Sequence, residues 1–161
     1  MAKRDPVKDR VKEFMREQDF HQEGSGRFKP WVRELDDVVW FVWLQVNKYG
    51  RRYYVNLGIN FKSIPDDARL PNPWHVTTRL ENEVQHVTWS RHDEILALMD
   101  LRKEMPDEER KARIRETLEQ FAMPFLRSCD SIEHAKAAHS NRRYLFSDSV
   151  QKVIYGALSA S

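Results

Sequence analysis

The sequence of 161 residues has little cysteine, little glycine and no strong excess of charge of either sign. Its only cysteine, Cys129, excludes an intramolecular disulfide framework and a zinc site built from cysteines. No apolar run reaches about 18 residues, so we expect no membrane span. The charged residues near the start have no apolar stretch behind them, so we expect no signal peptide. The single thiol favours a reducing, cytoplasmic location.

The charges that are present nearly cancel. Lys and Arg number 27 against 25 Asp and Glu, which leaves a formal net charge of +2. Hydrophobic residues make up 40% of the chain and aromatics 11%, enough to fill a core, so a wholly disordered chain is excluded. The length fits one domain, 1–161. Because the net charge is small, we do not expect a general nucleic-acid binder.

Hydrophobic periodicity divides the chain into three parts. Apolar side chains recur at helical spacing in 1–20, alternate in 26–89, and return to helical spacing in 92–159. This order predicts an α+β domain with an antiparallel sheet of four or five strands. We expect the N-terminal helix and the C-terminal helices to cover one face of that sheet. The C-terminal helices are predicted at 93–104, 107–123, 131–138 and 147–158, and Pro124 is expected to end or kink the second of them.

The hairpin 37–61 forms the centre of the predicted sheet. A two-residue turn at Tyr49 and Gly50 pairs Val46 with Tyr53 and places the alternating apolar set of both strands on one face. A slip by one residue would scatter these side chains over both faces. The apolar set is Val38, Trp40, Val42, Leu44 and Val46 in one strand, and Tyr53, Val55, Leu57, Ile59 and Phe61 in the other.

Further strands are predicted at 27–33, 74–80 and 83–89. A three-residue turn at 34–36 would put Phe28, Pro30 and Val32 on the apolar face, and Arg27, Lys29 and Trp31 on the other. Because proline cannot donate to a sheet ladder, Pro30 places its strand at an edge.

The polar face of this sheet is the candidate binding site. It combines aromatic rings with amides and cations, which suit an anionic ligand, a protein segment or single-stranded nucleic acid. The alternative is an ordinary solvated face whose aromatics merely cover Gly58. The predicted ligand-binding residues are Trp43, Gln45, Asn56, Asn60, His75, Arg79, Arg27 and Lys29.

Signatures of catalysis are scarce. The sequence has no P-loop, GxGxxG or GxSxG motif, and its histidines lack metal-ligand spacing, so we predict no catalytic residue, no metal and no cofactor. His75 and Arg79 share a strand face, with Thr77 between them. An enzyme acting on a small anionic or nucleotide-like substrate, with His75 as proton carrier and Arg79 as anion clamp, therefore remains open. Cys129 is expected to be a buried, inert thiol.

Several segments resemble a known family. Residues 19–28, 39–48, 53–59 and 75–80, and the step Met123-Pro124-Phe125-Leu126, are similar to the bacterial domain-of-unknown-function 4304 family. The resemblance spans about residues 7–130 and departs at Asp19-Phe20, where the family tends to have a Gly-Phe turn, and after about residue 130. It implies a small intracellular α+β domain with no established activity, so no catalytic residue is carried over. The matching positions include Asn56, Gly58, His75 and Arg79.

These observations lead to three hypotheses on function. The first is a non-enzymatic binding domain that holds a protein segment or a small anionic ligand on its polar face, with an immunity-protein-like role as one version by analogy of size and class. The second is the enzyme described above, and the third is a nucleic-acid binder. We expect a monomer or weak dimer, because Pro30 and the three cations of 27–33 oppose strand-to-strand pairing.

Overall fold

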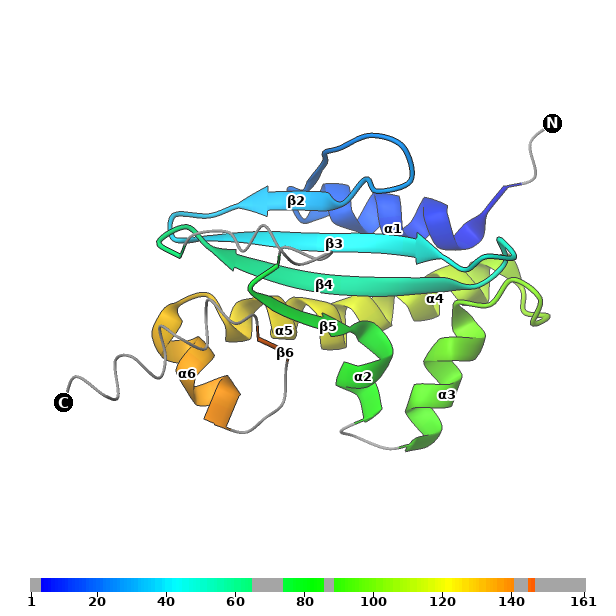
Figure 1. Cartoon of the computed structure of the whole chain (residues 1–161). Helices are drawn as coiled ribbons and strands as arrows, with labels where there is room; N and C mark the ends of the chain where they lie inside the picture. The colour runs from blue at the N-terminus through cyan, green and yellow to red at the C-terminus, as the bar shows by residue number, and fades with distance from the viewer. Residues whose placement is uncertain (1–3, 65–73, 86–88, 141–144, 147–161) are drawn as a thin grey trace.

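The computed structural model describes residues 4–64, 74–85, 89–140 and 145–146 (Figure 1). The helices are α1 (Pro6–Glu17), α2 (Leu80–Gln85), α3 (Trp89–Leu98), α4 (Asp107–Thr117), α5 (Met123–Ser128) and α6 (Ile132–Ser140). The strands are β1 (His21–Gln22), β2 (Trp31–Glu34), β3 (Val38–Val46), β4 (Tyr53–Phe61), β5 (Val76–Arg79) and β6 (Leu145–Phe146). Among the described helices, none combines the length and apolar character that a membrane crossing requires.

The strands form one antiparallel sheet in the order β1-β2-β3-β4-β5-β6. Figure 1 shows α1, α4 and α5 running along one side of this sheet. Their buried residues join those of the central strands in one core, which includes Phe14, Ile114, Trp40 and Leu57. The predicted α+β class is therefore confirmed. The two-residue strands β1 and β6 were not predicted.

The register of the central hairpin is confirmed. Val38 lies opposite Phe61 and Val46 opposite Tyr53, so the apolar residues share the core face. The turn is longer than predicted, because 48–51 form a four-residue loop in place of a two-residue turn. Asn47 closes this loop: its backbone N–H donates to Arg52 O at 2.9 Å, and its side-chain Oδ1 accepts from the N–H groups of Arg51 and Arg52. Gly50 takes a φ of 73°, which glycine adopts without strain.

The predicted register of the first edge strand is wrong. Trp31 pairs with Val42, a shift of three residues that exchanges the two faces of β2. The N–H of Leu35 donates to Val38 O at 2.9 Å and closes a tight turn at 36–37. Trp31 therefore joins the core, whereas Phe28 is 42% exposed. Burial of the large indole favours the observed shift.

Helix α1 begins as predicted. Asp5 caps it by accepting from the N–H groups of Val7 and Lys8, and Pro6 occupies the first turn. After the helix, Asp19 adopts a φ of 61°, a left-handed conformation that favours glycine. The chain then enters β1.

The strand predicted at 83–89 is wrong, because α2 follows β5 without a break. Leu80 and Glu83 lie one helical turn apart and are both buried. The carboxylate of Glu83 accepts from Thr78 Oγ1 at 2.9 Å, and the acidic first turn suits the helix dipole. This tertiary contact outweighs the local alternation that favoured a strand.

Pro124 does not end the helical run that begins at Asp107. A π-helical segment, Leu118–Ala122, widens the helix just before the proline, and the N–H of Met123 donates to Leu118 O. The wider turn accommodates a residue without an N–H group, so α5 continues to Ser128. The helix predicted at 93–104 instead spans Trp89–Leu98, and that at 131–138 corresponds to α6. The predicted helix 147–158 lies outside the described residues.

Candidate functional site

A hydrogen-bonded row of polar side chains crosses three strands on the face opposite the core. Asn56 Nδ2 donates to Gln45 Oε1 at 3.2 Å, and Arg79 Nε donates to Asn56 Oδ1 at 3.3 Å. The guanidinium of Arg79 lies 4.8 Å from the centre of the Tyr54 ring. With its side chain 43% exposed, Arg79 is a cation fixed in position at the surface of the sheet.

His75 and Asn60 are engaged in closing the end of β4. The backbone N–H of His75 donates to Asn60 Oδ1 at 2.8 Å, and the N–H of Phe61 donates to His75 Nδ1 at 2.8 Å. The rings of His75 and Phe61 stack at a centroid distance of 6.1 Å. His75 is only 1% exposed. These contacts leave the imidazole out of reach of a substrate at the surface.

Four aromatic rings gather beside the polar row. The ring of Trp74 stacks on Phe41 at 5.4 Å and lies directly over Gly58, while Phe28 meets Trp43 edge-on at 4.8 Å. Sequence reasoning had not assigned Trp74 to this face. The one available signal was Gly58, since a glycine inside a strand often marks a close approach by another group.

A groove lies beside the end of β3, where this strand extends beyond its pairing with β2. The paired part of β2 starts at Trp31, whereas β3 continues from Val42 to Val46 (Figure 1). The connection between β1 and β2 turns back at Gly26 and Arg27, through an isolated bridge between Ser25 and Phe28. A cavity of about 820 Å³ lies between this connection, the end of β3 and helix α1.

The cavity brings together half of the predicted site residues. Trp43 and Gln45 line it from β3, and Arg27 and Lys29 line it from the opposite wall. The prediction that Arg27 and Lys29 lie within the strand 27–33 is wrong, because they belong to the connection between β1 and β2. The polar row of Asn56 and Arg79 continues from Gln45 across the sheet. Asn60 and His75 lie at the other end of β4.

The charged side chains that line this cavity are all positive: Lys8, Lys12, Arg27, Lys29 and Lys48. We call the cavity the cationic groove. In the described part of the chain, none of these five side chains forms an ion pair. These five positive charges exceed the formal net charge of the chain, which is +2, so the remaining residues together carry a net negative charge. This asymmetry concentrates positive potential at the groove.

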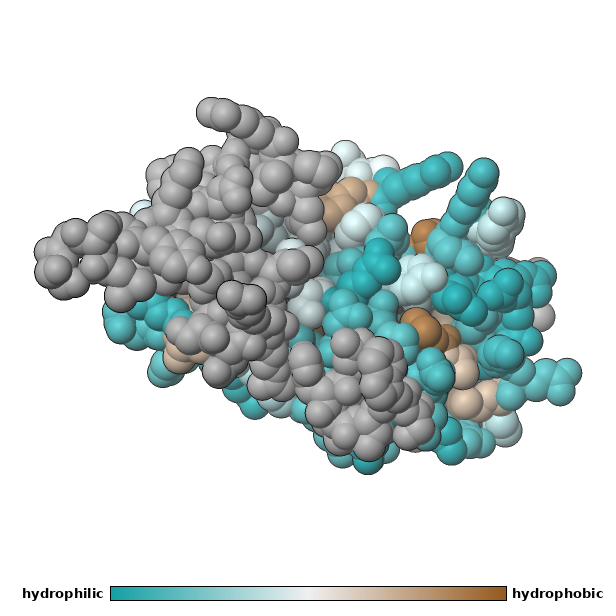
Figure 2. Space-filling view, turned by 60° about the horizontal axis from the view of Figure 1, so that its bottom comes forward, coloured by the Kyte–Doolittle hydropathy of each residue, from teal (hydrophilic) through white to brown (hydrophobic). Residues whose placement is uncertain are grey.

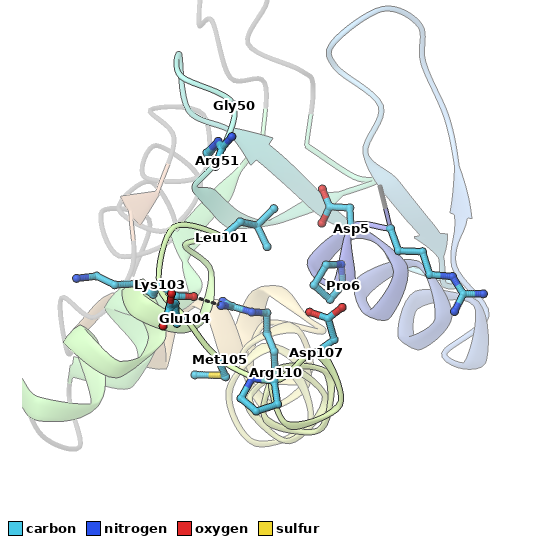
Figure 3. Close-up of a pocket in the computed structure, with 12 residues that line it drawn as sticks. Asp5, Pro6, Gly50, Arg51, Leu101, Lys103, Glu104, Met105, Asp107 and Arg110 are labelled. Atoms are coloured by element: carbon cyan, nitrogen blue, oxygen red, sulfur yellow. Dashed lines mark hydrogen bonds between the residues drawn. The ribbon is translucent and has the colours of Figure 1, made fainter. Parts of the chain in front are cut away.

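A second cavity, of about 800 Å³, lies where α1, the hairpin loop and the start of α4 meet (Figure 3). Its charges are of both signs, and two of its polar groups are occupied within the fold. Asp5 caps α1 and accepts from the hydroxyl of Tyr53, whose pKa is raised by burial and by this bond. Arg110 donates to carbonyl oxygens at the end of α3 and to Lys103 O. This cavity therefore resembles a structural junction more than a binding site.

The outer surface of the helices carries a smaller cavity, of about 370 Å³, which α3 and α4 line with charged residues of both signs. On the side shown in Figure 2, described residues at the surface are mostly hydrophilic, with small separate hydrophobic spots. Among the described residues, no three His, Cys, Asp or Glu side chains cluster in a way that would hold a metal ion.

The protein is an α+β domain in which helices cover one face of an antiparallel sheet and the cationic groove lies at the end of β3. A family model, Domain of unknown function (DUF4304), matches residues 17–128, and the chain belongs to that family. No curated protein and no solved structure shows significant similarity to it.

Proposed function

We propose that this protein is a binding module that holds an anionic protein segment or small anionic ligand in the cationic groove and along the adjoining polar row. The observation that carries the proposal is a hollow lined by five cations and no acidic residue, with the ring of Trp43 in its wall. Among the described residues, these cations form no ion pair. Cations without an internal counter-charge favour an external anion, because binding supplies that counter-charge. In a toxin-neutralising version of this proposal, the segment held would belong to a toxin.

The geometry favours binding over catalysis. The alternative enzyme requires His75 to exchange a proton with substrate, yet its ring is buried and its Nδ1 accepts from a backbone N–H. Arg79 lies at the surface, and its Nε is already bonded to Asn56. The guanidinium of Arg79 also lies 4.0 Å from the carboxylate of Glu81, whose side chain is 8% exposed. The arrangement therefore supplies an anchored cation whose neighbouring acid is largely buried.

A direct test measures binding of a fluorescein-labelled hexaglutamate peptide by anisotropy, with hexalysine and inorganic phosphate as comparisons. We expect the acidic peptide to bind, with affinity that falls as salt rises. The double variant Arg27→Ser/Lys29→Ser should weaken binding at least tenfold. The matched control Lys103→Ser/Arg127→Ser removes the same two charge types from exposed positions outside the groove, and should change affinity less than twofold.

The outcomes separate clearly. An equal loss in both double variants would show that only overall charge matters, and it would overturn the groove as the site. Binding of hexalysine in preference to hexaglutamate would overturn the sign of the ligand. If inorganic phosphate competes at millimolar concentration, the ligand class is a small anion; if it does not, a protein segment is favoured.

Trp43 allows a second test of the same surface. Trp43→Ala should weaken peptide binding while lowering stability by less than about 2 kcal/mol, because the ring is half-buried and packs on exposed Phe28. Trp40→Ala is the control on the core face, and should cost about 3–5 kcal/mol. Urea denaturation measures both. The reverse order of stability losses would contradict the assignment of the two faces.

A further inference from the structure

At the end of β3, one backbone edge borders the cationic groove and pairs with no strand among the described residues. In an antiparallel sheet, successive residues of a strand direct their N–H and C=O groups to alternate neighbours. Asn47 bonds toward β4 and Val38 O bonds toward β2. Odd-numbered residues of β3 therefore face β4, and even-numbered residues face β2.

Beyond Val42 the even-numbered residues have no strand beside them. The pairing between β2 and β3 covers Val39–Val42 only, so in the described part of the chain no strand pairs with this edge of Leu44 and Val46. Both residues line the groove, and Val46 is 45% exposed. The two positions are about 7 Å apart along the strand, the repeat of an extended peptide.

We infer that the cationic groove binds an extended acidic segment of a partner protein as an added β-strand, hydrogen-bonded to the free edge of β3 at Leu44 and Val46. This inference rests on the proposed function and names its partner class. Main-chain bonds to the strand edge would supply affinity, and the side chains would supply specificity.

Side-chain alternation specifies the sequence of such a segment. Lys8 and Lys12 reach the groove from α1 on the core side of the sheet, whereas Trp43 lies on the opposite face. Successive side chains of a bound strand point to opposite faces. Acidic residues at every second position would meet the two lysines, and apolar residues between them would contact Trp43.

Two other occupants fit less well. A second copy of this chain would bring the same cations against the edge, and like charges oppose that pairing. A single-stranded nucleic acid would match the charge and stack on Trp43, but it lacks the alternating donors and acceptors that the edges of Leu44 and Val46 are placed to meet. The strand edge therefore favours a peptide.

The test compares two peptides of equal charge. Acetyl-Glu-Val-Glu-Thr-Glu-amide should bind, and a form of the same peptide N-methylated at every residue should bind at least tenfold more weakly, because it cannot donate to the carbonyls of β3. If both peptides bind equally, strand addition is overturned while the proposed function stands. If neither binds, the proposed function fails as well.

Amide hydrogen exchange locates the contact without any substitution. In the complex with the unmodified peptide, the amides of Leu44 and Val46 should exchange at least tenfold more slowly than in the free protein. Trp43 and Gln45 serve as internal controls, because their amides already face β4 and should change little. Unchanged exchange at Leu44 and Val46 in the saturated complex would overturn the inference.

Val46→Pro tests the same edge from the protein side. It removes one N–H that faces the groove and none that faces β4, a position where sheets tolerate proline. We expect at least a tenfold loss of peptide affinity, with Val46→Thr unchanged within twofold. Tighter binding of oligouridylate than of the acidic peptide, or a dimer in sedimentation that Val46→Pro dissociates, would overturn the choice of occupant.

Discussion

The missing side chain of Gly58 lets the indole of Trp74 lie directly on strand β4. A Cβ at this position would come within 2.2 Å of Trp74 Cε3, far inside van der Waals contact. The ring is 3% exposed and stacks on Phe41. The absence of a side chain at Gly58 thus allows Trp74 and Phe41 to stack on the face opposite the core. These rings lie beside the polar row of the candidate site.

Gly58→Ala should therefore destabilise the protein by displacing the Trp74 ring. Overpacking of this kind costs about 1–3 kcal/mol, which urea denaturation can measure. In a Trp74→Ala background the same substitution should cost much less, because the clash is gone. Equal costs in the two backgrounds would contradict the contact between Gly58 and Trp74.

At the scale of elements, a buried carboxylate ties the end of α3 to the start of β4. Asp100 is 1% exposed and accepts from the guanidinium groups of Arg102 and Arg52. Backbone bonds accompany it: Tyr53 N–H donates to Met99 O at 3.0 Å, and Leu101 N–H donates to Arg51 O at 2.8 Å. The bonds from Arg102, followed by those from Arg52, hold the pKa of Asp100 well below its usual range.

Asp100→Asn should lower stability at pH 7 by about 2–3 kcal/mol, the usual scale for hydrogen bonds to a charged group. Because the folded-state pKa is depressed, this contribution is complete above the unfolded pKa of about 3.9 and is lost as pH falls toward the folded value. The gap between wild type and variant should therefore shrink in urea titrations between pH 4 and pH 2. Glu104→Gln, at an exposed position, is the control. A gap that stayed constant over this range would contradict the assignment.

At the scale of the whole molecule, the core extends to the helices after α4 and encloses the single thiol. Cys129 is fully buried beside residues of α5, and burial is the main cause that raises its pKa to about 11. Only about 0.1% of such a thiol is ionised at pH 8, and the thiolate is the reactive form. The rate at which this thiol reacts with a reagent therefore measures how often this part of the core opens.

Native protein should react with Ellman's reagent many times more slowly at pH 8 than protein unfolded in guanidinium, which should release one equivalent at once. The exposed control Ser63→Cys should release one of its two equivalents immediately in the native state. Rapid labelling of native wild type would show that the helical part opens independently of the sheet.

The central hairpin, the start of α1 and the separation of apolar from polar faces could all be predicted from the amino-acid pattern alone. A period of two over 38–46 and 53–61 permits only one register that places the alternating apolar set on the core side, so local pattern and global fold agree there. Trp43, Gln45, Asn56 and Arg79 could be placed on one face for the same reason.

The existence and position of the groove could not be predicted from the sequence, because they depend on tertiary contacts. The position of Trp31 in the core shifts β2 by three residues, and the contact between Phe28 and Trp43 accompanies the departure of the β1–β2 connection from β3. The placement of Trp74 over Gly58 likewise depends on a partner distant in the sequence. These arrangements depend on which of several distant segments gains more free energy from burial. A short-range hydrophobic pattern carries no information on that difference.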